Sequence, residues 1–335
     1  MGKARAARKL AAVAALGGGG AGVLGGTLVA ILIAEAILAK RTIGPPDGDP
    51  PCADGIYGEG PGEPISFVVL GDSTACGLGV KEPDETPGAL LATGLAALSG
   101  RPVRLTVVAK SGAETRHLDE QIDRALPVHP DLALIIIGAN DVTHRTLPSE
   151  SVRLLVHGVR RLRDAGAEVV VGTCPDLGTV EPLAFPLRQL ARAWSRRLAA
   201  AQTIACVEAG ARTVSLGSLL GPEFAAAPRE LFSSDRFHPS ATGYASAAVA
   251  LLPSIAAALG YWPEDESDVS LSDGEILPIS FAAVRAAKDA GTEVAATEVA
   301  GAERGPRGRW ALLRRRRHRD VPLDERQLSP EPKSA

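Results

Sequence analysis

The chain has 335 residues, enough for one large domain or two small ones, and 45% of them are hydrophobic, which is ordinary for a protein with a buried core. Its formal net charge of −3 argues against attraction of the whole molecule to nucleic acid, so we expect no specific nucleic-acid partner. Only 4% of the residues are aromatic, so the core must be built mainly from aliphatic side chains.

Residues 1–41 are a basic segment followed by a long apolar run. The run starts at Leu10, and Glu35 is its only charge before Lys40. It is longer than the roughly 7–15 apolar residues of a cleavable signal, and it can hold a spanning helix of about 20 residues. Because more positive charges precede the run than follow it, we expect a single-pass anchor with the remaining chain outside the cytoplasmic membrane. Cleavage near Ala34 and Ala36, which would release a secreted protein, is the alternative.

Four cysteines fit an exported domain: Cys52, Cys76, Cys174 and Cys206. An even number in that compartment allows two disulfides in any of three connectivities. The alternative is four buried thiols that act as small apolar side chains. No CxxC pair and no Cys/His cluster with zinc spacing occurs, so the sequence predicts no structural metal.

Residues 42–64 are rich in Pro, Gly and Asp, which is typical of a linker. Short apolar runs rich in β-branched residues then alternate with segments of helical length, such as residues 150–165 and 185–209. Apolar strands that alternate with helices are typical of a parallel sheet covered on both faces. We therefore predict a three-layer α/β/α domain over residues 65–262, with strands at residues 65–70, 103–109, 132–137, 168–173 and 213–216.

Residues 241–262 carry no charge and resemble a second membrane span, but Pro253 and a start rich in Ser, Thr and Gly favour a helix that closes the sheet. Beyond it, residues 263–335 are first acidic and then strongly basic, a pattern typical of a largely disordered tail. A short helix at residues 278–290 is compatible with this pattern. The basic part either binds an anionic surface or is simply solvated.

The first predicted strand ends in Gly71-Asp72-Ser73. A Ser just beyond the carboxyl end of a central strand lies where ligands bind in open α/β sheets, so Ser73 is a candidate nucleophile. Ser73 as a helix N-cap and a phosphate-binding turn are alternatives. A dinucleotide loop at residues 77–79 is a weaker one, because no third Gly follows at the required spacing.

A Ser hydroxyl needs a base to take its proton, and that base needs a third group to orient it. Two Asp-x-x-His pairs qualify, Asp141 with His144 and Asp235 with His238. The second pair lies between the last strand and the last helix, over the sheet edge where Ser73 is expected. We therefore favour His238 as the base, with Asp235 bound to its other ring nitrogen.

Two further strand ends carry candidate donors for a developing oxyanion. Ser-Gly-x-x-Thr follows the second strand, where Gly112 allows a backbone N–H to approach closely. Gly-x-Asn-Asp follows the third strand and supplies the neutral amide of Asn140. Taken singly, each block is more often a structural turn than a catalytic element.

The four blocks occur in this order across the predicted domain, and together they resemble the SGNH (GDSL-type) hydrolase family. The resemblance implies a flavodoxin-like sandwich with five parallel strands in the order 2-1-3-4-5, and ester hydrolysis without a metal or cofactor. It implies the following roles: Ser73 as nucleophile and oxyanion donor, Gly112 and Asn140 as further donors, His238 as base and Asp235 as its partner.

Two departures are visible. Thr74 stands where many members have Leu or Ile, and Ala109-Lys110 replaces a run that often contains Asn. Neither removes a catalytic group. The function expected is that of a membrane-bound serine esterase or lipase acting on acyl or acetyl esters of a lipid, a polysaccharide or a small alcohol. A catalytically silent cell-wall or lipid binding module is the alternative. A mononucleotide binder is disfavoured, since Asp72 would repel a phosphate.

Overall fold

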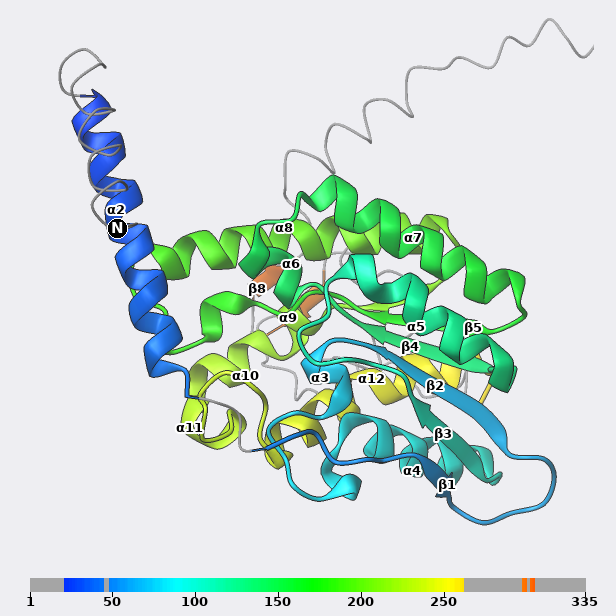
Figure 1. Ribbon diagram of the computed structural model, residues 1–335. Coiled ribbons are helices and arrows are strands. Elements are labelled where there is room, and N and C mark those ends of the chain that lie inside the picture. Colours follow the sequence, from blue (N-terminus) through cyan, green and yellow to red (C-terminus); the bar gives the residue numbers. More distant parts are fainter. Residues whose placement is uncertain (1–20, 45–47, 262–296, 300–301, 305–335) are drawn as a thin grey trace, which may run out of the picture.

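The computed structural model describes residues 21–44, 48–261, 297–299 and 302–304, and a six-stranded sheet forms its centre (Figure 1). The strand order is β1-β3-β2-β4-β5-β6, in which β1 is antiparallel to β3 and the other neighbours are parallel. The strands are β1 (Gly55–Tyr57), β2 (Ile65–Gly71), β3 (Val103–Val107), β4 (Leu132–Ile136), β5 (Glu168–Gly172) and β6 (Arg212–Val214). A separate antiparallel pair joins β7 (Thr297–Val299) to β8 (Ala302–Arg304).

The predicted order of the parallel strands is confirmed, because β2 to β6 lie in the order 2-1-3-4-5 when counted along the chain. The five predicted parallel strands are all present, and β1 is an unpredicted antiparallel strand added at the edge of the sheet. It lies inside residues 42–64, which the sequence predicts to be a linker. The three residues of β1 carry no strand pattern of their own, and Gly55–Tyr57 is held by pairing with β3. Ala53 beside it is buried.

Helices cover both faces of the sheet, as Figure 1 shows. One face carries α5, α7 and α8, and the other carries α4 and α12, which pack on each other. The helices that cover the sheet are α4 (Pro87–Ser99), α5 (Leu118–Ala125), α7 (Pro148–Asp164), α8 (Leu187–Glu208) and α12 (Ala241–Ala258). The shorter helices are α3 (Ser73–Cys76), η1 (Pro83–Glu85), η2 (Thr115–His117), η3 (Leu126–Val128), α6 (Ala139–His144), η4 (Leu177–Thr179), α9 (Leu216–Leu219), α10 (Gly221–Ala226) and α11 (Pro228–Leu231).

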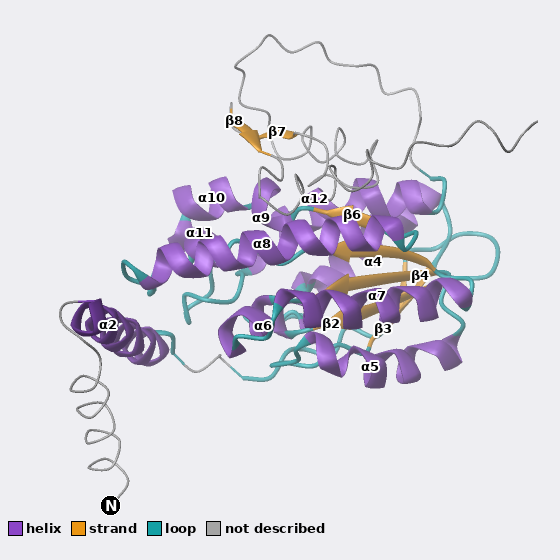
Figure 2. Ribbon diagram, turned by 90° about the horizontal axis from the view of Figure 1, so that it is seen from above, coloured by secondary structure: helices purple, strands orange, loops and turns teal. Residues whose placement is uncertain are grey.

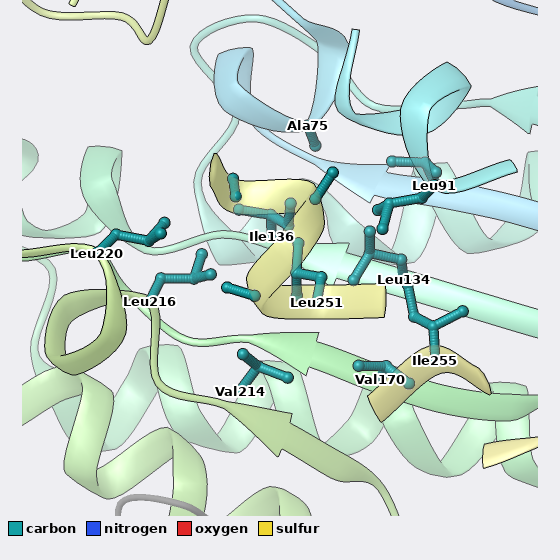
Figure 3. Close-up of a cluster of buried hydrophobic side chains, with 14 of the residues drawn as sticks. Ala75, Leu91, Leu134, Ile136, Val170, Val214, Leu216, Leu220, Leu251 and Ile255 are labelled. Atoms are coloured by element: carbon teal, nitrogen blue, oxygen red, sulfur yellow. The ribbon is translucent and has the colours of Figure 1, made fainter. Parts of the chain in front are cut away.

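Two apolar clusters lie on opposite faces of the sheet, because side chains alternate along each strand. In β2, Phe67 and Val69 belong to the cluster under α4 and α12, while Val68 and Leu70 belong to the cluster under α5 and α7. Figure 3 shows the first cluster, built from aliphatic residues of strands and helices alike. The expected aliphatic core is therefore present.

Helix α2 (Ala21–Thr42) lies at one end of the molecule, beside the start of α8 (Figure 2). Ala39 is buried, and Ile43 packs against the core. Other apolar side chains of α2, including Val29, Ile33 and Ile37, are exposed.

Helix α12 has the length and composition of a membrane-spanning helix, but 56% of it is buried in the domain. It is therefore the closing helix that the sequence predicts for residues 241–262. The basic residues 1–20 lie outside the described part of the chain. So does the predicted tail at residues 263–335, except for β7 and β8.

The two disulfides that the sequence allows are not formed, since all four cysteines are free thiols. Cys174 and Cys206 are buried and belong to different apolar clusters. Cys76 is buried at the end of α3, and Cys52 is exposed. The alternative of buried thiols holds for three of the four.

Candidate active site

The turn after β2 is fixed by close packing at Gly71. A side chain on Gly71 would place its Cβ 1.9 Å from the carbonyl oxygen of Ile136 in β4, and its φ is 139°, so only glycine fits. The side chain of Gln121, on α5, binds both the N–H and the carbonyl of Gly71, at 2.8 and 2.9 Å. These contacts hold the backbone that presents Ser73.

Asp72 caps helix α3, because its Oδ1 accepts a hydrogen bond from the Thr74 N–H at 3.0 Å. The alternative in which Ser73 is the N-cap is therefore wrong, and the Ser73 hydroxyl is left for another partner. Burial raises the pKa of Asp72 to about 7, although the bond from Thr74 and the nearby His238 oppose this rise.

Ser73, His238 and Asp235 form a continuous chain of hydrogen bonds. Ser73 Oγ lies 2.9 Å from His238 Nε2, and His238 Nδ1 lies 2.6 Å from Asp235 Oδ2. A carboxylate only accepts hydrogen bonds, so Nδ1 carries the proton and Nε2 is free to accept from the serine hydroxyl. The three residues are 7%, 9% and 3% exposed, respectively. The structure thus brings together the three residues predicted to be catalytic.

The loop between α11 and α12 holds Asp235 through its second oxygen. Asp235 Oδ1 accepts from Ser233 Oγ and from the backbone N–H groups of Phe237 and His238, at 2.8, 2.8 and 2.9 Å. Burial of the carboxyl favours its neutral form, but the hydrogen bonds from His238 and Phe237 outweigh burial and lower the pKa of Asp235 to about 2. Asp235 is therefore ionised at neutral pH and can stabilise the imidazolium that forms when His238 takes a proton.

The two predicted oxyanion donors lie on segments that are tied together. Asn140 Nδ2, at the start of α6, donates to the carbonyl of Ala113 at 3.0 Å, and Asp141 accepts from the Thr115 N–H at 3.1 Å. The Asn140 amide keeps a second N–H beyond this bond. Gly112 lies on the same loop with a φ of 77°, which favours glycine there.

The rival pair of Asp141 and His144 is not a catalytic dyad. His144 Nδ1 lies 3.0 Å from the carboxylate of Glu114, and the His144 side chain is exposed at the end of α6. Asp141 binds the backbone of Thr115 instead. Sequence analysis did not single out Glu114, which is buried in this part of the site. Its carboxylate accepts a hydrogen bond from Thr146 and pairs with His144 and Arg116.

A mostly apolar pocket with a cavity volume of about 80 Å³ opens beside Ser73 and Asn140. One wall is the loop after β5, including Leu177 and Val180, and the opposite wall comes from the helices after β6. Sequence analysis missed these helices, α9 to α11, because they are short and carry no repeating apolar pattern. The aromatic lining consists of Phe224, Phe232, Phe237 and Tyr244.

Arginines on α8 hold the pocket wall that follows β5. Arg188 donates to the carbonyls of Glu181 and Leu183, at 2.7 Å each. Arg196 Nε donates to the buried Asp176 at 3.3 Å, and Arg192 Nε lies 3.4 Å from the same carboxylate oxygen. Among the described residues, no group of three or more His, Cys, Asp or Glu side chains is arranged to hold a metal ion.

Residues 69–246, more than half of the chain, match the GDSL-like lipase/acylhydrolase family. The chain belongs to this family. A GDSL-like esterase of Mycobacterium tuberculosis is 44% identical over 246 residues, which cover 68% of this chain and 78% of that protein. This GDSL-like hydrolase is therefore an esterase or lipase type of ester hydrolase that acts on an ester substrate, as the sequence predicts.

Solved structures resemble this GDSL-like hydrolase in fold. An acetylxylan esterase from Geobacillus stearothermophilus has 18% sequence identity and a TM-score of 0.44, and covers 62% of this chain and 98% of its own. An alpha/beta hydrolase from the metagenome of Lake Arreo has 20% identity and a TM-score of 0.45, and covers 60% of this chain and 97% of its own. The predicted three-layer α/β/α sandwich of the SGNH type is confirmed.

Proposed function

We propose that the protein hydrolyses acyl esters through a covalent acyl-enzyme on Ser73. The chain of bonds from Ser73 Oγ to His238 Nε2, at 2.9 Å, and from His238 Nδ1 to Asp235 Oδ2, at 2.6 Å, carries this proposal. Ser73 Oγ attacks the ester carbonyl while His238 takes its proton. When the bond to the leaving alcohol breaks, His238 gives that proton to the alcohol oxygen. Water then attacks the acyl-enzyme with His238 again as base, and Ser73 is regenerated.

The oxyanion that forms during each attack needs donors, and we propose the backbone N–H groups of Ser73 and Gly112 and the side chain of Asn140. The bond from Asn140 to Ala113 supports this role, because it holds the amide in one orientation before substrate arrives. The second N–H of that amide is available to the oxyanion. Asp141, which binds Thr115, keeps the Gly112 loop next to Asn140.

We propose that the acyl group of the substrate enters the pocket beside Ser73. The lining is mostly apolar and includes Leu177, Val180, Leu216 and Phe224, which suits a hydrocarbon chain better than a sugar ring. The acid part of the substrate is thus an aliphatic acyl group. The alcohol part, whether of a lipid, a polysaccharide or a small molecule, would lie toward solvent.

We further propose that α2 anchors the enzyme in the cytoplasmic membrane with the catalytic domain on the outer side. This arrangement is supported by the exposed apolar side chains of α2, by its C-terminal charges Lys40 and Arg41, and by the four basic residues among the first nine of the chain. Lys40 and Arg41 lie in the last turn of α2 and would be placed at the outer membrane–water interface.

Burst kinetics of the full chain in detergent micelles test the mechanism. With p-nitrophenyl esters from acetate to dodecanoate, we expect a burst of p-nitrophenol equal to one per enzyme and an acyl adduct on Ser73 by mass spectrometry. Ser73→Ala should lower kcat by at least about 10⁴-fold and abolish the adduct. His238→Ala should lower kcat as severely, whereas His144→Ala, the matched control, should have a modest effect. Full activity of Ser73→Ala would overturn the mechanism.

A further inference from the structure

Two large apolar side chains project from the start of α8. Phe185 is 75% exposed just before the helix, and Leu190 is 44% exposed one turn into it. Both lie outside the pocket beside Ser73. Helix α2, which contacts α8, also exposes Val29, Ile33 and Ile37, so exposed apolar side chains are concentrated on these two helices.

A hydrogen bond ties this end of the domain to α2. The carboxylate of Glu35 accepts from the Leu187 N–H, the first amide of α8, at 3.0 Å. Pro186, the residue at the N-cap of α8, has no side-chain acceptor to offer this amide. An acidic side chain within an apolar helix is costly in a membrane unless it has a partner, and here the positive end of α8 supplies one.

The bond sets the depth of α8 relative to the basic end of α2. Glu35 precedes Lys40 by five residues, which corresponds to about 7–8 Å along a helix. Lys40 and Arg41 mark the level of the polar interface if α2 spans the membrane. The start of α8 would then lie about 7 Å toward the hydrocarbon, within the roughly 5–10 Å reached by interfacial apolar side chains.

The charge on α8 fits the same placement. Its first three turns carry Arg188, Arg192, Arg196 and Arg197, and the one carboxylate of Asp176, which pairs with Arg192 and Arg196, offsets only part of this positive charge. The net positive charge that remains attracts this end of the domain to anionic headgroups at a membrane surface. Long arginine side chains also reach from an apolar level to the interface.

We propose that the Phe185–Leu190 end of the domain inserts into the outer interface of an anionic bilayer, beside α2. This proposal rests on the proposed membrane anchor. Figure 1 shows α2 at the end of the molecule toward which the parallel strands point, the end at which Ser73 lies. We call residues 185–190 the tip. The inserted tip holds the carboxyl ends of the parallel strands, where Ser73 lies, against the membrane, so that esters carried by lipids reach Ser73 from the bilayer.

Spin-label depth measurements on the full chain in phosphatidylcholine–phosphatidylglycerol vesicles test the insertion. Cys52→Ser removes the exposed thiol, and the other three cysteines are buried. Single nitroxide labels are then attached to Phe185→Cys, to Leu190→Cys and to two reference positions. Ile33→Cys reports on the anchor. Val128→Cys lies near the start of β2, at the end of the sheet opposite Ser73.

We expect the labels at Phe185 and Leu190 to be more accessible to oxygen than to a water-soluble nickel chelate, like the label at Ile33 and unlike the label at Val128. If Ile33 is in lipid while both tip labels behave like Val128, the insertion is overturned and the anchor stands. If Ile33 is itself in water, the anchor fails and the insertion fails with it. Retained hydrolysis of a soluble ester shows that each labelled protein is folded.

Discussion

At the scale of single residues, Asp235 uses one carboxylate oxygen for His238 Nδ1 and the other for the backbone of its own loop. Asp235→Asn preserves shape and an oxygen for the loop, but an amide N–H group facing His238 favours the wrong imidazole tautomer. We expect kcat to fall by about 10⁴-fold with little change in KM. Steady-state kinetics with a soluble p-nitrophenyl ester measures both constants. A variant that keeps a tenth of the activity would contradict this role.

Asp72 provides a test of a buried carboxyl group through pH. Its pKa in the folded chain is raised to about 7 from 3.8, so its contribution to stability is complete below 3.8 and is lost as pH rises through 7. Asp72→Asn keeps an oxygen that accepts from the Thr74 N–H, but it cannot ionise.

We therefore expect Asp72→Asn to raise the melting temperature at pH 8.5 by about 2–4 °C or more, corresponding to at least about 1 kcal/mol, and to change it little at pH 4. Calorimetry at the two pH values measures this difference. Asp84→Asn, a change at an exposed carboxyl group, is the control and should shift neither value. Equal shifts of Asp72→Asn at both pH values would show that ionisation is not the cause.

The sequence predicts the three residues of the hydrogen-bonded chain because each lies in a short block with a recognisable order along the chain. It does not predict the residues that hold them. Gln121, which binds both backbone groups of Gly71, and Glu114, which binds His144, lie far from their partners in sequence or outside any motif. Such contacts depend on which elements the fold brings together, and a single sequence carries no signal for them.

At the scale of elements, the contact between α2 and α8 depends on one side chain. Glu35→Leu removes the acceptor for the Leu187 N–H, and we expect a loss of about 1 kcal/mol in the free energy of unfolding. Glu35→Gln keeps an oxygen acceptor and should lose only a few tenths of a kcal/mol, from the missing charge at the helix end. Thermal unfolding in detergent micelles compares the two variants. Equal destabilisation would mean that the bond itself contributes little.

Five parallel strands are predictable because each falls in or beside a short run rich in β-branched residues, and the order of these strands follows from the family resemblance. β1 and α9 to α11 are not predictable in the same way. β1 has three residues and owes its extended form to pairing with β3, and α9 to α11 have four to six residues each. Elements this short are stabilised by their neighbours rather than by their own periodicity.

At the scale of the whole molecule, the positions of α2, α8 and the pocket bear on how the domain is oriented relative to the membrane. α2 and the start of α8 lie at the end of the molecule where Ser73 and the pocket wall after β5 are found (Figure 1). A domain tethered only through residues near Thr42 would be free to turn away from the membrane. A second contact, at Phe185 and Leu190, would fix one orientation. The orientation then selects between substrates in the bilayer and substrates in water.

This selection predicts a difference between two substrates of the same enzyme. In Phe185→Ser/Leu190→Ser, the tip loses the apolar side chains whose burial would contribute roughly 1.5–3 kcal/mol each. A loss of only about 1.4 kcal/mol in the oriented state lowers its equilibrium constant about tenfold. We therefore expect hydrolysis of a fluorogenic diacyl ester embedded in vesicles to fall by about tenfold. Hydrolysis of a soluble short-chain ester should be unchanged, because neither residue lines the pocket.

Val128→Ser is the matched control for the loss of an exposed apolar side chain. Val128 lies near the start of β2, at the end of the sheet opposite Ser73. It should affect neither substrate. An equal fall on both substrates in the double variant would point to damage at the active site, and unchanged hydrolysis in vesicles would mean that the tip does not orient the domain. Only a loss confined to the vesicle substrate follows from insertion, because the anchor is intact in every variant and the catalytic residues are untouched.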